Sequence, residues 1–152
     1  MEELAQMTEP SVRNSISGLH RKAPGSIGDM MEFQVIAEDR EKGEYLLRCR
    51  TFEWMRNALG TLHGGMGAAV VDQAMGFVAY SYMRGAGVTP TIQLQLNYHR
   101  PLVAGEDVLL RVRVISVTRT LVGMTCEAMA ASDPERICIT ATGTSFLKLM
   151  EK

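Results

Sequence analysis

The stretch NALGTLHGGMGAAVVDQAMGFVAYSYM, residues 57–83, decides the fold of this chain. It begins as a loop, because Gly60 interrupts regular structure and the Gly64–Gly65 pair lets another molecule approach the backbone closely. After these glycines the residues are apolar or small on nearly every face, a pattern typical of a helix that is surrounded by protein. We therefore predict a loop that leads into one long helix, from Gly65 to Met83.

The main polar exception within this helix is Asp72, which is followed by Gln73. A carboxylate is costly to bury unless it is hydrogen-bonded or has a chemical task, so both a structural and a catalytic interpretation remain open. Nine residues separate His63 from Asp72, which places them about 180° apart around a helix axis and ~13 Å apart along it. If both are catalytic, each active site must combine two copies of the chain, and the spacing then predicts a dimer.

Composition limits the classes of protein that are compatible with this sequence. The 152 residues suit one domain, and 46% hydrophobic with 22% charged residues are typical of a globular protein. A net charge of −1 provides no basic surface for nucleic acid, and the central Asp72 argues against a membrane span. The amino terminus is acidic and lacks the basic-then-apolar order of a signal peptide, so we expect no export signal. Cys49, Cys126 and Cys138 lie in strand-like runs. We expect a cytoplasmic protein with buried free thiols.

The rest of the chain predicts mostly strands. Residues 1–29 are an N-terminal helical extension, with Thr8-Glu9-Pro10 as the helix start, and residues 33–53 form a hairpin. Strand-like runs follow the long helix at residues 91–101, 107–120, 121–132 and 136–149. Short turns between strands require antiparallel pairing, and one apolar sheet face requires a cover. We predict an α+β domain over residues 30–152, with an antiparallel sheet of about six strands around one long central helix.

This layout resembles the hotdog-fold thioesterases, in particular the phenylacetic-acid-degradation (PaaI-like) branch of acyl-CoA thioesterases. The resemblance covers residues 30–149. It depends on Asn57, on His63-Gly64-Gly65 six residues later, and on Asp72 nine residues after His63. The strand that opens at Thr91 and the segment from Tyr98 through Pro101 to Gly105-Glu106-Asp107 fit as well.

The resemblance implies hydrolysis of acyl-CoA or aryl-CoA thioesters at a site shared between two subunits. The backbone N–H of Gly64, joined by that of Gly65, would polarise the thioester carbonyl. Asp72 of the partner subunit would act as general base or as nucleophile. Free N–H groups at the start of a helix are independently suited to this task, because they point toward developing negative charge with the positive end of the helix dipole.

Three further residues receive roles from the resemblance. Asn57 would position the water or the leaving group, and His63 would orient the thioester. Thr91 would supply a hydroxyl near the attacking water, with Thr89 as the neighbouring candidate. On the residues alone, His63 is equally compatible with a simple helix cap.

Two other classes of function remain as alternatives. A hydratase or dehydratase of the same fold would use a histidine as base, and a non-catalytic acyl-CoA binding protein would need no base. The three histidines have no metal-ligand spacing, so we expect neither metal nor cofactor. The expected partners are the thioester substrate and further copies of the chain, as a homodimer or as a dimer of dimers in a homotetramer.

Overall fold

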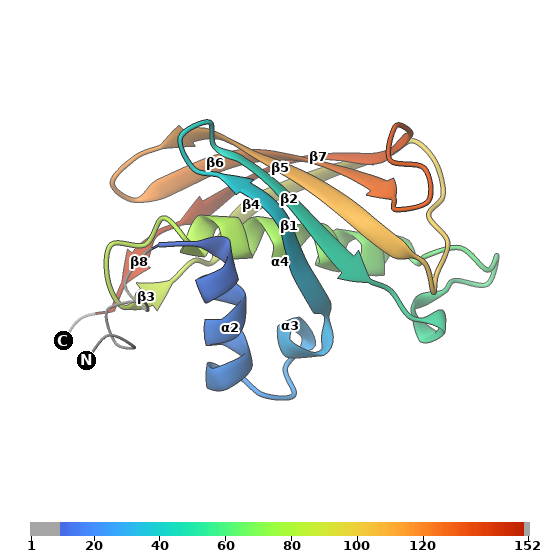
Figure 1. Ribbon diagram of the computed structural model, residues 1–152, viewed down its shortest axis with the longest axis horizontal. Helices are drawn as coiled ribbons and strands as arrows, with labels where there is room; N and C mark the ends of the chain where they lie inside the picture. The colour runs from blue at the N-terminus through green and yellow to red at the C-terminus, as the bar shows by residue number, and fades with distance from the viewer. Residues whose placement is uncertain (1–9, 151–152) are drawn as a thin grey trace.

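A computed structural model describes residues 10–150 of the chain. A curved antiparallel sheet covers one side of the long helix α4, and the short helices α2 and α3 lie on the opposite side of α4 from the sheet (Figure 1). This arrangement confirms the predicted α+β class with six strands around one central helix. The elements are α2 (Val12–Lys22), α3 (Ile27–Met30), β1 (Glu32–Asp39), β2 (Glu44–Arg50), a 3-10 turn η1 (Glu53–Met55), α4 (Gly64–Tyr80), β3 (Gly87–Val88), β4 (Thr91–Tyr98), β5 (Asp107–Val117), β6 (Leu121–Ala130), β7 (Ile137–Phe146) and β8 (Lys148–Leu149).

The six-stranded sheet has the order β1-β2-β5-β6-β7-β4, and every pairing is antiparallel. The strand that follows α4 does not pair with the next strand along the chain. β4 instead lies beside β7 at one edge, and β5 lies beside β2. β3 and β8 form a separate two-stranded ribbon. Only one long side of β4 is therefore hydrogen-bonded within the described chain.

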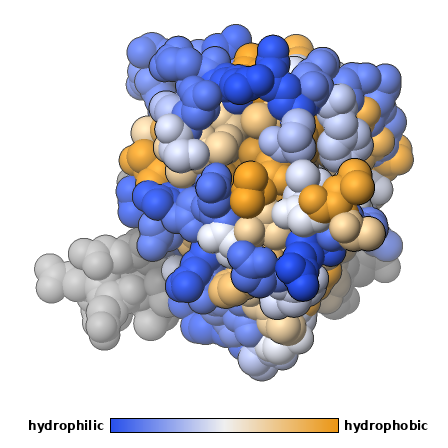
Figure 2. Space-filling view, turned by 90° about the vertical axis from the view of Figure 1, so that its right-hand side faces the viewer, coloured by the Kyte–Doolittle hydropathy of each residue, from blue (hydrophilic) through white to orange (hydrophobic). Residues whose placement is uncertain are grey.

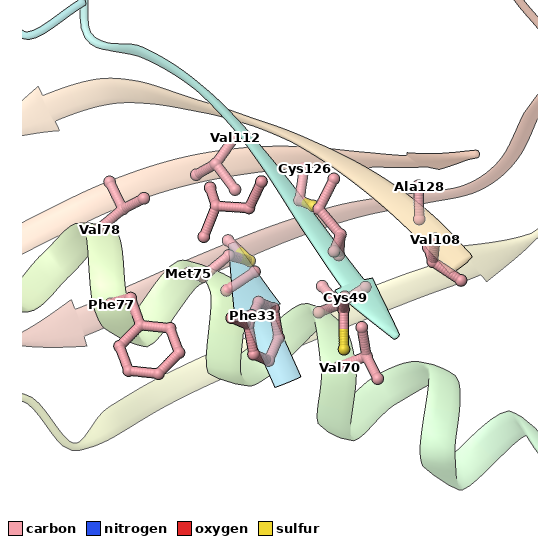
Figure 3. Close-up of a cluster of buried hydrophobic side chains, with 14 of the residues drawn as sticks. Phe33, Cys49, Val70, Met75, Phe77, Val78, Val108, Val112, Cys126 and Ala128 are labelled. Atoms are coloured by element: carbon pink, nitrogen blue, oxygen red, sulfur yellow. The ribbon is translucent and has the colours of Figure 1, made fainter. Parts of the chain in front are cut away.

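The core lies between α4 and the sheet, where the side chains of the helix point toward those of the strands (Figure 3). Val70, Met75 and Val78 are almost completely buried on this face of α4. Phe77 meets Phe33 of β1 edge to face, with 5.3 Å between the ring centroids. Aromatic pairs of this geometry contribute beyond their buried area. The helix is thus held by one continuous apolar seam.

The opposite flank of α4 is less covered than the sequence predicts. Asp72, Gln73 and Gly76 are half-buried, and Gly64 and Gly65 are exposed. Within one chain the helix is therefore only partly surrounded by protein, because the sheet covers one side of it and α2 covers part of the other. The helix also ends at Tyr80, three residues before the predicted end.

The N-terminal extension contains the predicted short helix. The Oγ of Ser11 accepts a hydrogen bond from the Asn14 N–H and caps α2, whereas Thr8 and Glu9 of the predicted start lie outside the described residues. Val12 and Ile16 are buried, and α2 packs against α4. The extension therefore contributes to the core and forms a second wall beside α4.

All three cysteines are buried and free, as predicted. Burial raises the pKa of the Cys49 thiol to about 12 and that of the Cys126 thiol to about 12, because an apolar environment disfavours the thiolate. Neither thiol is therefore suited to act as a nucleophile at neutral pH. Within residues 10–150, no helix is long and apolar enough to cross a membrane.

Candidate active site

The loop before α4 is organised by Asn57. Its side-chain Oδ1 accepts hydrogen bonds from the N–H groups of Leu59 (2.9 Å) and Thr61 (3.1 Å), and its Nδ2 donates to the Thr61 Oγ1 (2.8 Å). Asn and Asp side chains often stabilise turns in this manner. Asn57 therefore shapes the loop that precedes the helix, and one N–H of its amide group is left for another partner.

His63 is the N-cap residue of α4. Its Nδ1 accepts a hydrogen bond from the Gly65 N–H at 2.9 Å, so a neutral ring carries its proton on Nε2. A Cβ added at Gly65 would lie 3.1 Å from the same Nδ1, so a larger residue here would require the His63 ring to shift by a few tenths of an ångström. His63 therefore caps α4, as the residues alone allowed. Because the Gly65 N–H donates to the His63 ring, it is already hydrogen-bonded within the chain.

The Gly64 amide differs from that of Gly65. Among the residues that the structure describes, the Gly64 N–H has no hydrogen-bond acceptor. The Tyr98 hydroxyl donates to the Gly64 carbonyl at 2.6 Å and so holds the next peptide unit, between Gly64 and Gly65. A Cβ added at Gly64 would meet only the Tyr98 ring, at an ordinary distance of 3.8 Å. The packing of the chain therefore does not require glycine here, whereas close approach of a ligand would.

These groups surround one cavity of about 310 Å³ at the start of α4. Figure 2 views the molecule from this end, where apolar side chains gather near the centre of the face and polar ones surround them. The predicted residues in the wall of this cavity are Asn57, His63 and Gly64, joined by Tyr98. Sequence reasoning did not assign a role to Tyr98, because its position follows from the placement of β4 across the helix start.

Asp72 and Thr91 lie together at a second place. The Thr91 hydroxyl donates to the Asp72 Oδ1 at 2.7 Å, so the carboxylate of α4 is joined to the first residue of β4. Both residues line a cavity of about 470 Å³ between α2 and α4, and Thr89 lines it as well. Of the two threonines that the resemblance suggested, Thr91 rather than Thr89 is hydrogen-bonded to Asp72.

The two cavities have no lining residue in common. One chain therefore brings Asn57, His63 and Gly64 together, and brings Asp72 and Thr91 together, but does not bring the two groups to one reacting atom. Across residues 10–150, no three histidine, cysteine, aspartate or glutamate side chains are placed to hold a metal ion.

A curved antiparallel sheet around one long central helix defines the hotdog fold. The sequence model of the thioesterase superfamily matches residues 59–137. The chain therefore belongs to the thioesterase superfamily, and the predicted resemblance is confirmed.

Known relatives agree with this membership. Human acyl-coenzyme A thioesterase 13 is 32% identical over 80 residues, which cover 52% of this chain and 56% of the human protein, so the match spans about half the length of that relative. A phenylacetic-acid-degradation-related protein from Ralstonia eutropha has the same fold, with a TM-score of 0.74 and 22% identity over 87% of this chain and 98% of its own. A Streptococcus mutans protein bound to acetyl CoA has a TM-score of 0.66, at 22% identity over 80% of this chain and 92% of its own.

Proposed function

We propose that this protein is an acyl-CoA thioesterase that hydrolyses acyl-CoA or aryl-CoA thioesters to the free acid and coenzyme A. Membership of the superfamily, the human relative and the acetyl-CoA-bound protein of the same fold support this proposal. The observation that carries it is the separation of two polar groups, because the hydrogen-bonded Asp72 and Thr91 line one cavity and Gly64 lines another. In the proposal, Asp72 and Thr91 of one copy complement the Gly64 N–H of another.

The reaction uses these groups in a simple order. Asp72 accepts a proton from a water molecule, which the Thr91 hydroxyl helps to hold, and the water oxygen forms a bond to the thioester carbonyl carbon. The Gly64 N–H of the other copy donates to the oxyanion of the tetrahedral intermediate. The C–S bond then breaks, the thiolate of coenzyme A takes the proton from Asp72, and the carboxylic acid is released. Direct attack by the Asp72 carboxylate is the alternative course of the same step.

The remaining predicted residues support the Gly64 amide. Asn57 holds the loop through Thr61 and offers its free amide N–H to water or to the leaving group. The cap between His63 and the Gly65 N–H fixes the first turn of α4, so His63 orients the thioester through the turn and through its Nε2. Gly64 is therefore the proposed oxyanion donor, and Gly65 contributes to the shape of the turn.

The proposed assembly is a homodimer, with a dimer of dimers as the larger form. Two features support it besides the separate cavities. Within residues 10–150, β4 pairs only with β7 and so presents a free edge, and Ile92 on this strand is 59% exposed. An unpaired strand edge with an exposed apolar residue favours pairing with another chain. The free, buried cysteines further support a reducing compartment such as the cytoplasm.

The direct test is release of free thiol from a panel of acyl-CoA and aryl-CoA thioesters, with the Asp72→Asn variant as the control for contaminating activity. The proposal expects turnover by the native protein on at least one thioester and almost none by the variant. Equal turnover by the two proteins, or no turnover on any thioester, contradicts it.

A mixing experiment tests the sharing of the site. Asp72→Asn and Gly64→Val chains are each expected to be inactive alone. When they form heterodimers, one site carries both defects and the other carries neither, so activity should return. Light scattering and differently tagged chains confirm that heterodimers have formed. No recovery in confirmed heterodimers means that Asp72 does not serve the Gly64 of another copy.

A further inference from the structure

The cavity of about 470 Å³ extends well beyond Asp72 and Thr91. Its wall on α4 includes Asp72, Gly76 and Tyr80, which follow one another at intervals of four residues along the same flank of the helix. Eight residues of helix place Tyr80 ~12 Å from Asp72 along the axis. The opposite wall comes from one face of α2. The cavity thus runs along α4 from the candidate catalytic carboxylate toward the helix end.

Two glycines face this cavity from opposite walls, Gly18 on α2 and Gly76 on α4. Both lie inside helices, where glycine destabilises the helix relative to alanine. A Cβ added at either position would meet no other atom within 4 Å, and neither glycine has a positive φ. Neither packing nor backbone geometry therefore requires glycine at these positions. Because both residues lack a side chain, they leave the cavity wider at these two positions.

The far end of the cavity is polar and carries a positive charge. The Lys22 Nζ donates to the Tyr80 hydroxyl at 3.2 Å and lies 5.7 Å from the centre of the Tyr80 ring. In the part of the chain that the structure describes, no carboxylate forms an ion pair with Lys22. Between the two polar ends, the wall includes the apolar side chains of Leu19, Phe77 and Val88.

We propose that this cavity receives the acyl group of the thioester, that Gly18 and Gly76 set its width, and that the Lys22–Tyr80 pair selects acyl groups that end in a carboxylate. The inference rests on the proposed function, since it takes the thioester carbonyl to lie near Asp72. An acyl group that starts there and follows α4 passes an apolar wall and reaches an unpaired cation. A dicarboxylic acid joined to coenzyme A through one carboxyl group has this order of apolar and charged parts.

The first experiment tests the position of the acyl group without requiring catalysis. S-octyl-coenzyme A is a thioether that cannot be hydrolysed, and calorimetry compares its affinity with that of free coenzyme A. Gly76→Leu and Gly18→Leu should each weaken binding of the thioether by about tenfold or more, because the added side chain fills the cavity. Binding of free coenzyme A should not change. Ser17→Leu is the matched control, because it adds the same bulk to an exposed position of α2 outside the cavity.

The second experiment tests the selection of a carboxylate. Adipyl-CoA and hexanoyl-CoA differ only in the terminal carboxylate, so the ratio of their kcat/KM values isolates its contribution. The native protein should prefer adipyl-CoA, and Lys22→Met should lower the ratio by up to about fivefold, the upper end of the range for an ion pair with an exposed lysine. Tyr80→Phe should lower it less, and added salt should lower it only where Lys22 is present. Arg21→Met is the control, because it removes a neighbouring charge outside the cavity.

The outcomes separate this inference from the proposed function. If both leucine variants fold and bind S-octyl-coenzyme A as tightly as the native protein, the acyl group lies elsewhere. If the leucine variants weaken binding but no thioester is hydrolysed, the cavity assignment stands and the proposed activity is wrong. If the ratio of adipyl-CoA to hexanoyl-CoA is the same in the native protein and in Lys22→Met, the selection of a carboxylate is wrong.

Discussion

At the scale of single residues, Asp72 was conspicuous in the sequence because it is a carboxylate within an apolar helix. The structure gives it one hydrogen bond, from the Thr91 hydroxyl, and leaves it half-buried beside a cavity. A carboxylate with a purely structural task is usually enclosed in the fold together with its hydrogen-bond partners. The open position of Asp72 therefore favours a chemical task over a structural one.

Replacement of Asp72 by Asn separates these two interpretations. Asn is nearly isosteric and its Oδ1 can still accept from Thr91, so the free energy of unfolding should change little while turnover falls by about 10²-fold or more. Urea denaturation and thiol release measure the two quantities on one sample. A purely structural Asp72 would instead give nearly normal turnover in Asp72→Asn, because the amide oxygen keeps the hydrogen bond from Thr91.

Gly64→Val is expected to lower turnover by about 10²-fold, because the side chain crowds the amide that would bind the oxyanion. The melting temperature should change little, since a Cβ at this position meets only the Tyr98 ring at 3.8 Å. Gly65→Ala provides the contrast, because its Cβ would press on the His63 cap and should lower stability as well. Unchanged turnover in Gly64→Val would rule out the oxyanion role.

At the scale of elements, the sequence predicted which segments form strands more reliably than it predicted where they lie. Alternating apolar residues identified β4, β5, β6 and β7, because each strand carries its own period of two. The placement of β4 beside β7 depends on how the whole sheet closes over α4, which no local pattern records. The contact of Tyr98 with Gly64 follows from this placement and could not be predicted for the same reason.

The same distinction applies to the cavity between α2 and α4. Val12 and Ile16 are four residues apart on one face of α2, and both are buried. The sequence did not show that Lys22 would meet Tyr80, 58 residues later in the chain, because that contact depends on the docking of one helix on the other. The resemblance thus suggested the candidate site residues, whereas tertiary packing determined what surrounds them.

The exposed edge of β4 leads to a prediction about assembly. Ile92→Lys should leave the single chain folded, because 59% of this side chain is exposed, but it should weaken association by placing a charge at a free strand edge. Light scattering should show a lower mass, and turnover should fall in parallel. Ile115→Lys is the matched control on β5, where the isoleucine is 65% exposed away from that edge. Full assembly of Ile92→Lys would show that β4 is not the contact.

At the scale of the whole molecule, the buried thiols predict how stability depends on pH. The pKa of Cys49 and that of Cys126 are both raised to about 12 from an ordinary value of 9.0. Between these values the unfolded chain loses thiol protons that the folded chain keeps, so the unfolded state binds fewer protons and stability falls as pH rises. Below about pH 9 these two thiols should contribute nothing to the pH dependence of stability.

Urea denaturation at a series of pH values measures this dependence. The free energy of unfolding should decline above about pH 9, and Cys126→Ala should make the decline shallower. Tyr45, whose pKa is also raised by burial, adds to the same trend and remains in the variant. An identical slope in the native protein and in Cys126→Ala would show that this thiol titrates alike in both states.

The separation of the two cavities has a consequence for the life of the molecule in the cell. If the proposed roles are correct, a newly made chain would carry the proton acceptor at one cavity and the oxyanion donor at another, and neither would complete the reaction alone. Hydrolysis would then require two associated chains. Dilution would therefore lower the activity per chain, and total activity would rise more steeply than the protein concentration. The requirement for association would thus prevent single, newly made chains from hydrolysing acyl-CoA.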